Sequence, residues 1–331
     1  LAPSSEILWR YEMPETAFEA AVVVASGVLY VGDADGTIHA VSLADGEALW
    51  TKQFDKTGFL SPAAVEGDRL WVGDYNGVVY CLSTKDGSER WQVTLAAEVM
   101  AGPNLHEGNL LVTTEAGTFT CLDAESGDQK WEFVIEAPLR CTPTVIGGRA
   151  MLAGCDGKLH AIDLASGDEV EAIEIDGPTG STPAARDNRL YFGTEQGTFY
   201  AIDTAKSPME VTWQYADVRR RQGIRTAAAV NDELAVFGSQ GKAVYAVDLA
   251  AGEPKWTFPT RTRVESSPLI TGNSAVVATQ RGRLYLVDLE SGEATWDYGA
   301  GGGFMASPVV IHGKLIIGNT DGTLYCFGKK E

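Results

Sequence analysis

The chain has 331 residues, 44% of them hydrophobic and 21% charged, a composition that predicts a globular protein with a large core and excludes a disordered one. Its 26 basic and 45 acidic side chains give a formal net charge of −19, which repels nucleic acids and anionic lipid surfaces, so we expect no nucleic acid partner. No apolar run approaches the roughly 20 residues that cross a bilayer, so we expect no transmembrane segment.

The first predicted element is a short strand at residues 6–12, within the stretch SEILWRYEMP. The sequence before it lacks the basic and then apolar layout of a signal peptide, so we expect any export signal to have been removed. This strand has no hairpin partner beside it in the chain. It is similar instead to the end of a later repeat, SGEATWDYGA at residues 291–300.

The rest of the chain is a series of repeats, each marked by a turn glycine. The marks are Gly36, Gly77, Gly117, Gly157, Gly197, Gly241, Gly282 and Gly322, which are 40 to 44 residues apart. An alternating apolar run precedes each glycine and another follows it, as in VLYVG and TIHAV of the first repeat. Alternation with period two predicts strands, and pairs such as Asp35-Gly36 predict tight hairpins between them.

A second turn follows ten residues later in most repeats, and a tryptophan then ends the unit. Each repeat is therefore a four-stranded meander, which is the size of one propeller blade. We predict an all-β fold, an eight-bladed β-propeller of four-stranded antiparallel blades. The last repeat ends after its third strand, so residues 304–328 and the N-terminal strand 6–12 are expected to form blade eight together, closing residues 1–331 into a single domain without a free sheet edge.

The repeat also resembles that of a known family. The pattern G-x-[LF]-[YH]-[AC]-[ILV]-[DS]-x-x-[ST]-G-x-x-x-W ends on Trp50, Trp91, Trp131, Trp213, Trp256 and Trp296. It is similar to the tryptophan-docking repeat of quinoprotein-type (PQQ-like repeat) eight-bladed propellers. That family includes dehydrogenases that use pyrroloquinoline quinone and a non-enzymatic branch typified by the lipoprotein scaffold of the bacterial outer-membrane protein assembly machine. The resemblance implies that the tryptophans pack between blades, with a weaker junction where Glu171 replaces one.

Residue types that often carry chemistry follow the register of the repeat. Cys81, Cys121 and Cys326 stand four places after the turn glycine, where other blades have alanine, so a small buried slot explains them. The four histidines are dispersed and form no metal motif. The stretch GDADG at residues 32–36 begins like a calcium loop but lacks the glutamate that such a loop needs. We therefore predict no resident metal and no cofactor.

Candidate binding residues come from the innermost strand of each blade, which borders the central channel. Aligning the repeats on a recurrent proline places one variable side chain per blade three residues before it. This ring comprises Glu19, Phe59, Met100, Arg140, Gly180, Arg225, Glu265 and Met305. Apolar side chains crowd one side and charged ones the other, the combination that peptide and small-molecule pockets use. The alternative is that these residues only neutralise one another, with Arg225 paired to Glu265.

The connection into the sixth blade is a second candidate. The distance from Trp213 to Ala228, which replaces the recurrent proline, is 15 residues, against 12 in the other internal blades. The insertion carries Arg219, Arg220 and Arg221, and guanidinium groups bind carboxylates in bidentate fashion. Long loops on rigid scaffolds often bind partners, although an arginine run is also compatible with a solvated loop.

We therefore predict a monomeric, non-catalytic scaffold that binds a protein segment or a small ligand at the channel mouth and the adjoining loops. One alternative is a dehydrogenase that uses pyrroloquinoline quinone and calcium, but nearly constant blade length and the lack of a vicinal cysteine pair argue against it. A polysaccharide-binding propeller is another, with Trp71, Phe59, Tyr75 and Phe304 as stacking aromatics.

Two questions of context stay open at this stage. The chain is also compatible with the sensor part of a larger protein. The family resemblance implies the periplasm or the cell envelope, whereas five cysteines without an evident pairing pattern suit a reducing compartment equally well.

Overall fold

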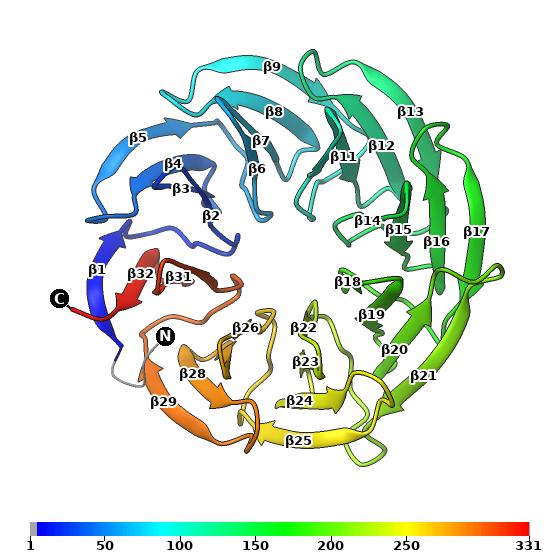
Figure 1. Ribbon diagram of the computed structural model, residues 1–331. Coiled ribbons are helices and arrows are strands. Elements are labelled where there is room, and N and C mark those ends of the chain that lie inside the picture. The colour runs from blue at the N-terminus through cyan, green and yellow to red at the C-terminus, as the bar shows by residue number, and fades with distance from the viewer. Residues whose placement is uncertain (1–4, 331) are drawn as a thin grey trace.

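The structure is a computed structural model that describes residues 5–330. These residues form β-strands and no helix, and therefore no helix that could cross a membrane. Figure 1 shows eight sheets arranged in a ring around a central axis. Each sheet has four strands, and hydrogen-bonded neighbours follow one another in the chain except where the ring closes. The predicted all-β, eight-bladed propeller is confirmed.

The strands occupy equivalent positions in every blade. The innermost strands are β2 (Val23–Ala25), β6 (Ala64–Glu66), β10 (Asn104–His106), β14 (Thr144–Ile146), β18 (Ala184–Arg186), β22 (Ala229–Val230), β26 (Leu269–Thr271) and β30 (Val309–Ile311). The second strands are β3 (Val28–Gly32), β7 (Arg69–Gly73), β11 (Asn109–Thr113), β15 (Arg149–Ala153), β19 (Arg189–Gly193), β23 (Leu234–Ser239), β27 (Ser274–Ala278) and β31 (Lys314–Gly318). The third strands are β4 (Thr37–Ser42), β8 (Val78–Ser83), β12 (Thr118–Asp123), β16 (Lys158–Asp163), β20 (Thr198–Asp203), β24 (Ala243–Asp248), β28 (Arg283–Asp288) and β32 (Thr323–Gly328). The outermost strands are β5 (Ala48–Gln53), β9 (Glu89–Thr94), β13 (Gln129–Val134), β17 (Glu169–Glu174), β21 (Glu210–Ala216), β25 (Pro254–Pro259), β29 (Ala294–Gly299) and β1 (Glu6–Glu12).

The core lies between the second and third strands of neighbouring blades. These strands are almost continuously buried, as in β3 and β4, because both of their faces are covered by the adjacent sheets. The outermost strands alternate between exposed and half-buried residues, as β5 does. Such alternation is expected when one face of a strand packs on the core and the other faces water.

The two ends of the chain close the ring. Strand β1 pairs antiparallel with β32, and Trp9 lies opposite Cys326. In Figure 1 the blue strand β1 lies beside the red strand β32. The indole of Trp9 is 8% exposed and its Nε1 donates a hydrogen bond of 3.2 Å to the carbonyl of Leu43 in the first blade. Blade eight is therefore completed by the N-terminal strand, which also contacts blade one.

Four tryptophans of the outermost strands, Trp50, Trp131, Trp213 and Trp256, contact the next blade in the same way. Trp50 Nε1 donates to the carbonyl of Thr84 at 3.0 Å, and Trp131 Nε1 donates to that of Leu164 at 3.1 Å. Each ring also lies against a turn glycine of that blade, so a Cβ added to Gly87 would come within 2.8 Å of the Trp50 ring. Because Gly87 also has a φ of +70°, the turn requires glycine for both reasons.

The junction at Glu171 is built differently. The blade that it contacts has no glycine in the corresponding turn; instead the backbone N–H of Met209 donates to the Glu171 carboxylate, and the Met209 side chain is buried. The carbonyl of Thr204, which a tryptophan would bind in other blades, accepts a hydrogen bond of 2.7 Å from Arg149 Nη2. The tryptophan and the turn glycine that contact each other at other junctions are thus both replaced at this one.

Replacing Glu171 by tryptophan should therefore destabilise the protein, by about 1–3 kcal/mol, because the new ring would overfill a rebuilt junction and leave the Met209 N–H without its acceptor. Chemical denaturation followed by circular dichroism measures the change. Glu174→Trp, at an exposed position of the same strand, is the matched control and should change stability by less than about 0.5 kcal/mol. A gain in stability for Glu171→Trp would contradict this account.

Candidate functional site

The channel mouth is built where two kinds of loop meet on one face of the ring. The turn between the second and third strands of each blade contacts the connection that leads into that blade from the preceding one. Ala34 N–H donates to Ala17 O at 3.0 Å, and Tyr75 N–H donates to Gly58 O at 2.9 Å. Equivalent backbone bonds recur at every junction. The mouth residues are therefore held by main-chain hydrogen bonds between blades.

These bonds correct one predicted member of the ring. Phe59 N–H donates to Asp33 O at 2.9 Å, as Val99 N–H does to Asp74 O at 3.1 Å. Phe59 is thus equivalent to Val99, and its side chain is fully buried in the core. The prediction that Phe59 lines the mouth is wrong, because the proline of this blade, Pro62, stands one place earlier in the register. Leu60 occupies the mouth position instead.

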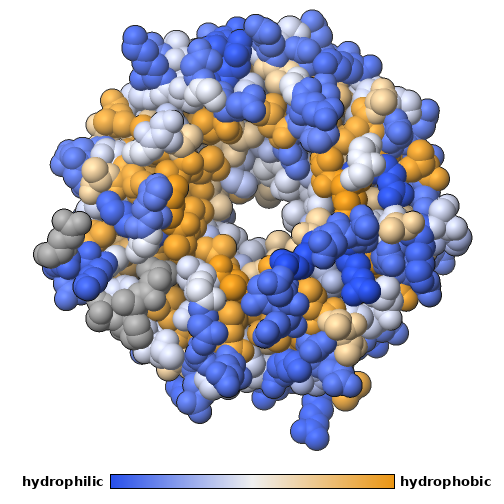
Figure 2. Space-filling view, in the orientation of Figure 1, coloured by the Kyte–Doolittle hydropathy of each residue, from blue (hydrophilic) through white to orange (hydrophobic). Residues whose placement is uncertain are grey.

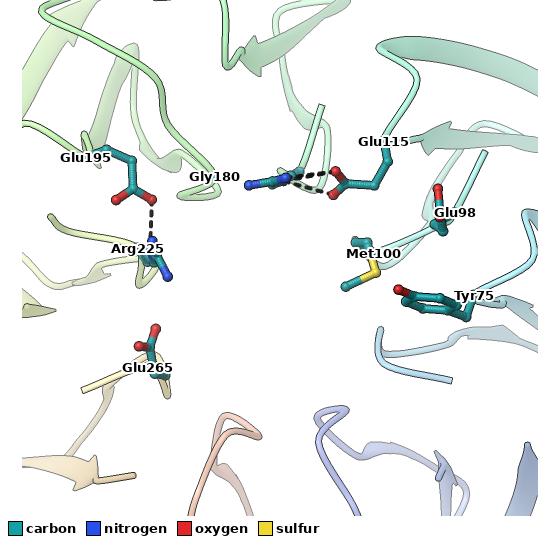
Figure 3. Close-up of a pocket in the computed structure, with 9 residues that line it drawn as sticks. Tyr75, Glu98, Met100, Glu115, Gly180, Glu195, Arg225 and Glu265 are labelled. Carbon is teal, nitrogen blue, oxygen red and sulfur yellow. Dashed lines mark hydrogen bonds and ion pairs between the residues drawn. The ribbon is translucent and has the colours of Figure 1, made fainter. Parts of the chain in front are cut away.

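Four of the predicted residues meet in one cavity of about 600 Å³ at the mouth. They are Met100, Arg140, Arg225 and Glu265, and Gly180 leaves room among them. Tyr75, Glu98, Glu115 and Glu195 complete the lining, as Figure 3 shows. Glu19 and Met305 are half-buried and lie outside the lining of this cavity. Figure 2 shows that the centre of the ring is open.

Both arginines of the cavity pair with the turn of the preceding blade. Arg140 donates through Nε and Nη2 to the Glu115 carboxylate at 2.9 and 3.0 Å, and Arg225 Nε donates to Glu195 at 2.7 Å (Figure 3). These hydrogen bonds raise the pKa of each guanidinium above its ordinary value. The predicted pairing of Arg225 with Glu265 is wrong, since Glu265 accepts a hydrogen bond of 2.6 Å from Gln240.

The turn residues of the site were not among the predicted binding residues. Glu115 and Glu195 each stand two places before the turn glycine, and Tyr75 does so in its own blade. That shared register was visible in the repeat, so it could have identified a second ring of mouth residues. Glu115 and Glu195 contact the arginine of the next blade rather than a residue of their own blade. That contact depends on how neighbouring sheets are placed in the folded ring, so the repeat alone does not give it.

The charges in the cavity do not balance. Four carboxylates line it against two guanidinium groups, and the two arginines are already paired with Glu115 and Glu195. Glu98 and Glu265 have no cationic partner among residues 5–330. The cavity therefore favours a positively charged group, and Met100 together with the 51% exposed ring of Tyr75 provides apolar contact beside it.

The arginines of the long loop lie beside this cavity. Arg221 pairs with Asp176 at 3.0 Å and donates to the carbonyl of Gln196 at 2.9 Å. The side chains of Arg219 and Arg220 are exposed, while their backbone N–H groups donate to Asp217 at 2.9 and 3.2 Å. Asp217 thus fixes the loop, and two of the three arginines point away from internal partners.

The quinone-dehydrogenase and polysaccharide-binding alternatives are not favoured by these residues. No group of three His, Cys, Asp or Glu side chains within residues 5–330 is arranged to hold a metal ion, and two of the cavity carboxylates are engaged by arginine, so a calcium-bound quinone finds no ligand set here. Of the aromatics proposed for sugar stacking, Trp71, Phe59 and Phe304 are at most 2% exposed. The polysaccharide prediction is wrong in these three residues because all of them pack in the core.

Fold and repeat together define the class of this protein, an eight-bladed propeller of the PQQ-like repeat type. The family model described as outer membrane protein assembly factor BamB matches residues 1–72, 34–212 and 142–331. The chain therefore belongs to that family, as the sequence resemblance predicted. No curated protein matches the sequence.

Solved structures of the same fold come from diverse sources. BamB from Moraxella catarrhalis is 17% identical, with a TM-score of 0.84 over 99% of this chain and 98% of that one. The computationally designed Ika8 protein is 14% identical, with a TM-score of 0.86 over 98% and 100%. Sqt1 from Saccharomyces cerevisiae is 13% identical, with a TM-score of 0.86 over 99% and 100%. At these identities the likeness concerns the fold.

Proposed function

We propose that the protein is a non-catalytic scaffold whose mouth cavity binds a segment of a partner protein through a basic side chain. The observation that carries this proposal is the cavity itself, in which Glu98 and Glu265 face the ligand space without a cation. Membership of the BamB family supports a scaffold that binds proteins. The same membership supports a location in the periplasm or cell envelope, and we expect a monomer.

The dimensions of the cavity favour a few side chains of a peptide rather than a whole domain. Its volume of about 600 Å³ is within the range of small-ligand sites. The rim is preorganised by the arginine pairs, since Arg140 and Arg225 are each held by a carboxylate of the neighbouring blade. A ligand therefore orders few additional groups when it binds, which lowers the entropic cost of association.

Selection of peptides from a displayed library on the wild-type protein tests this proposal. We expect the selected peptides to carry lysine or arginine and to bind at least about tenfold more weakly to the Glu98→Gln/Glu265→Gln variant. Glu47→Gln/Glu290→Gln removes the same charge from exposed turns on the opposite face and should leave affinity unchanged. Selection of no peptide, or equal binding to all three proteins, would overturn the proposal.

The enzymatic alternative has its own measurement. A ligand that binds only the native state raises the melting temperature as its concentration rises. We expect pyrroloquinoline quinone with calcium to leave the melting temperature unchanged. A rise that depends on quinone concentration would contradict the non-catalytic assignment.

A further inference from the structure

Basic side chains are concentrated on the mouth face of blades six and seven. Four loops there, residues 217–225, 239–242, 260–265 and 279–283, hold nine of the 26 basic residues of the chain but only two of its 45 acidic ones. We call these nine residues the basic belt. They are Arg219, Arg220, Arg221, Arg225, Lys242, Arg261, Arg263, Arg281 and Arg283.

The four loops form one continuous surface. Gln240 N–H donates to Gly223 O at 2.9 Å, which joins the long loop to the turn of blade six. Thr260 N–H donates to Lys242 O at 3.0 Å, which joins that turn to the next connection. Gln280 N–H donates to Arg263 O at 3.3 Å and adds the turn of blade seven. The belt is thus a contiguous patch that extends across two blades.

Most of the belt is free to meet a partner. Three arginines have acidic partners, namely Arg221 with Asp176, Arg225 with Glu195 and Arg283 with Asp297. The other six side chains are exposed and form no ion pair with any residue between 5 and 330. Like charges in a cluster repel one another. Six of the nine positive charges in the belt have no carboxylate paired with them in the part of the chain that the structure describes.

Lys242 carries an additional cost. It has a φ of +62° at the turn position where the seven other blades have glycine, as at Gly282 with +71°. The predicted register mark Gly241 is therefore one residue early. A left-handed conformation is unfavourable for a non-glycine residue, and residues kept in such conformations cluster at functional sites. At this position the left-handed backbone carries the Lys242 side chain, which adds one more positive charge to the belt.

A groove beside the belt offers apolar contact as well. It has a volume of about 560 Å³ and lies between blades six and seven. Arg261, Arg281 and Arg283 line it together with Phe258, Tyr285 and Asp297, and the Asp297 carboxylate is paired with Arg283. The Arg283 guanidinium lies 5.7 Å from the centre of the Tyr285 ring, so the ring keeps that arginine oriented. Cations around an aromatic floor suit a chain that alternates carboxylates and apolar side chains.

We propose that the basic belt binds an acidic, extended segment of a partner protein, with carboxylates on Arg261, Arg263 and Arg281 and an apolar side chain in the groove. This inference rests on the proposed protein-binding function but uses Arg261, Arg263 and Arg281, which lie outside the lining of the mouth cavity; Arg225 is the one belt residue that lines that cavity. A peptide segment is favoured over nucleic acid or an anionic membrane, because those larger polyanions also meet the rest of a chain whose net charge is −19.

Fluorescence anisotropy with a short labelled peptide of alternating glutamate and leucine tests the belt. We expect binding that weakens as ionic strength rises to about 0.15 M and above, and at least about tenfold weaker binding to Arg261→Glu/Arg281→Glu. Arg263→Gln/Arg281→Gln, which changes less charge, should show a smaller loss in the same direction. Lys85→Glu/Lys329→Glu makes the same change of charge at exposed positions away from the belt and should bind like the wild type.

Binding measurements with other anionic ligands distinguish an acidic peptide from nucleic acid or lipid, and they distinguish the belt proposal from the cavity proposal. Tighter binding of a single-stranded oligonucleotide or of anionic lipid vesicles than of the acidic peptide would overturn the assignment to a protein segment. No binding of the acidic peptide, or equal binding to the wild type and to Arg261→Glu/Arg281→Glu, would overturn the belt itself. The basic peptides selected on the cavity should bind the belt variants normally, so failure at one surface is distinguishable from failure at the other.

Discussion

Replacing Trp9 by alanine is expected to lower the free energy of unfolding by about 3–5 kcal/mol, the usual cost of removing a buried tryptophan. The ring of Trp9 lies on the turn glycine Gly46 of blade one, and its Nε1 donates to Leu43 O. The substitution removes both contacts at the point where the ring closes. Denaturation followed by circular dichroism measures the loss without relying on the emission of the remaining tryptophans.

Trp9 stands where the ring closes, which is why it matters more than a tryptophan inside the chain. Strand β1 is a terminal strand that pairs with β32 and contacts blade one through the apolar cluster around Trp9 and a hydrogen bond of 3.0 Å between Tyr11 and His39. Terminal elements open locally before the protein unfolds globally. Hydrogen exchange of β1 amides should therefore accelerate more than exchange in the central strands.

An exposed residue of the adjoining blade serves as the control for this prediction. Leu49 is 55% exposed on an outermost strand, so Leu49→Ala should change stability by less than about 0.5 kcal/mol. Similar losses for Trp9→Ala and Leu49→Ala would mean that the N-terminal strand contributes little to closure.

The fold could be predicted from the sequence because one contact between neighbouring blades requires a tryptophan and a glycine, and it recurs at six of the eight junctions. The turn glycine is required where a tryptophan ring lies on it, as Gly87 is by Trp50, so glycine and tryptophan recur together with the period of a blade. The exception obeys the same rule, since the blade that meets Glu171 has lost its glycine too. A repeated contact leaves a repeated pattern, and the pattern gives the number of blades.

The site was less predictable because each of its positions occurs once. Aligning the repeats on the recurrent proline shifted the residues of blade two by one place. Pro62 follows Phe59 by three residues, whereas Pro103 follows the equivalent Val99 by four. Hydrophobicity did not reveal the error, because Phe59 and Leu60 are both apolar and adjacent. The hydrogen bond from Phe59 N–H to Asp33 O and the full burial of the Phe59 ring distinguish them in the folded protein. Likewise the acidic partner of Arg225, Glu195, comes from the preceding blade rather than the following one.

The corrected register makes a sharp prediction for two neighbouring residues. Phe59→Ala should lower the free energy of unfolding by about 3–5 kcal/mol, because its ring is fully buried and contacts the aromatic rings of Phe54 and Tyr80. Leu60→Ala should cost less than about 1 kcal/mol, because Leu60 is half-buried at the mouth. Urea denaturation of the two variants beside the wild type measures both values.

Variants of the two residues should also differ in their affinity for cavity-binding peptides, so the comparison tests the site as well as the packing. Leu60 takes the register position that Met100 and Arg140 take in the lining of the cavity, so we expect Leu60→Ala to leave stability almost intact while it alters affinity for cavity-binding peptides. Phe59 faces the core, so a conservative Phe59→Leu variant that still folds should bind those peptides like the wild type. If Phe59→Leu weakened binding and Leu60→Ala weakened folding, the original alignment on Pro62 would be correct and the hydrogen-bonded register of blade two would be wrong.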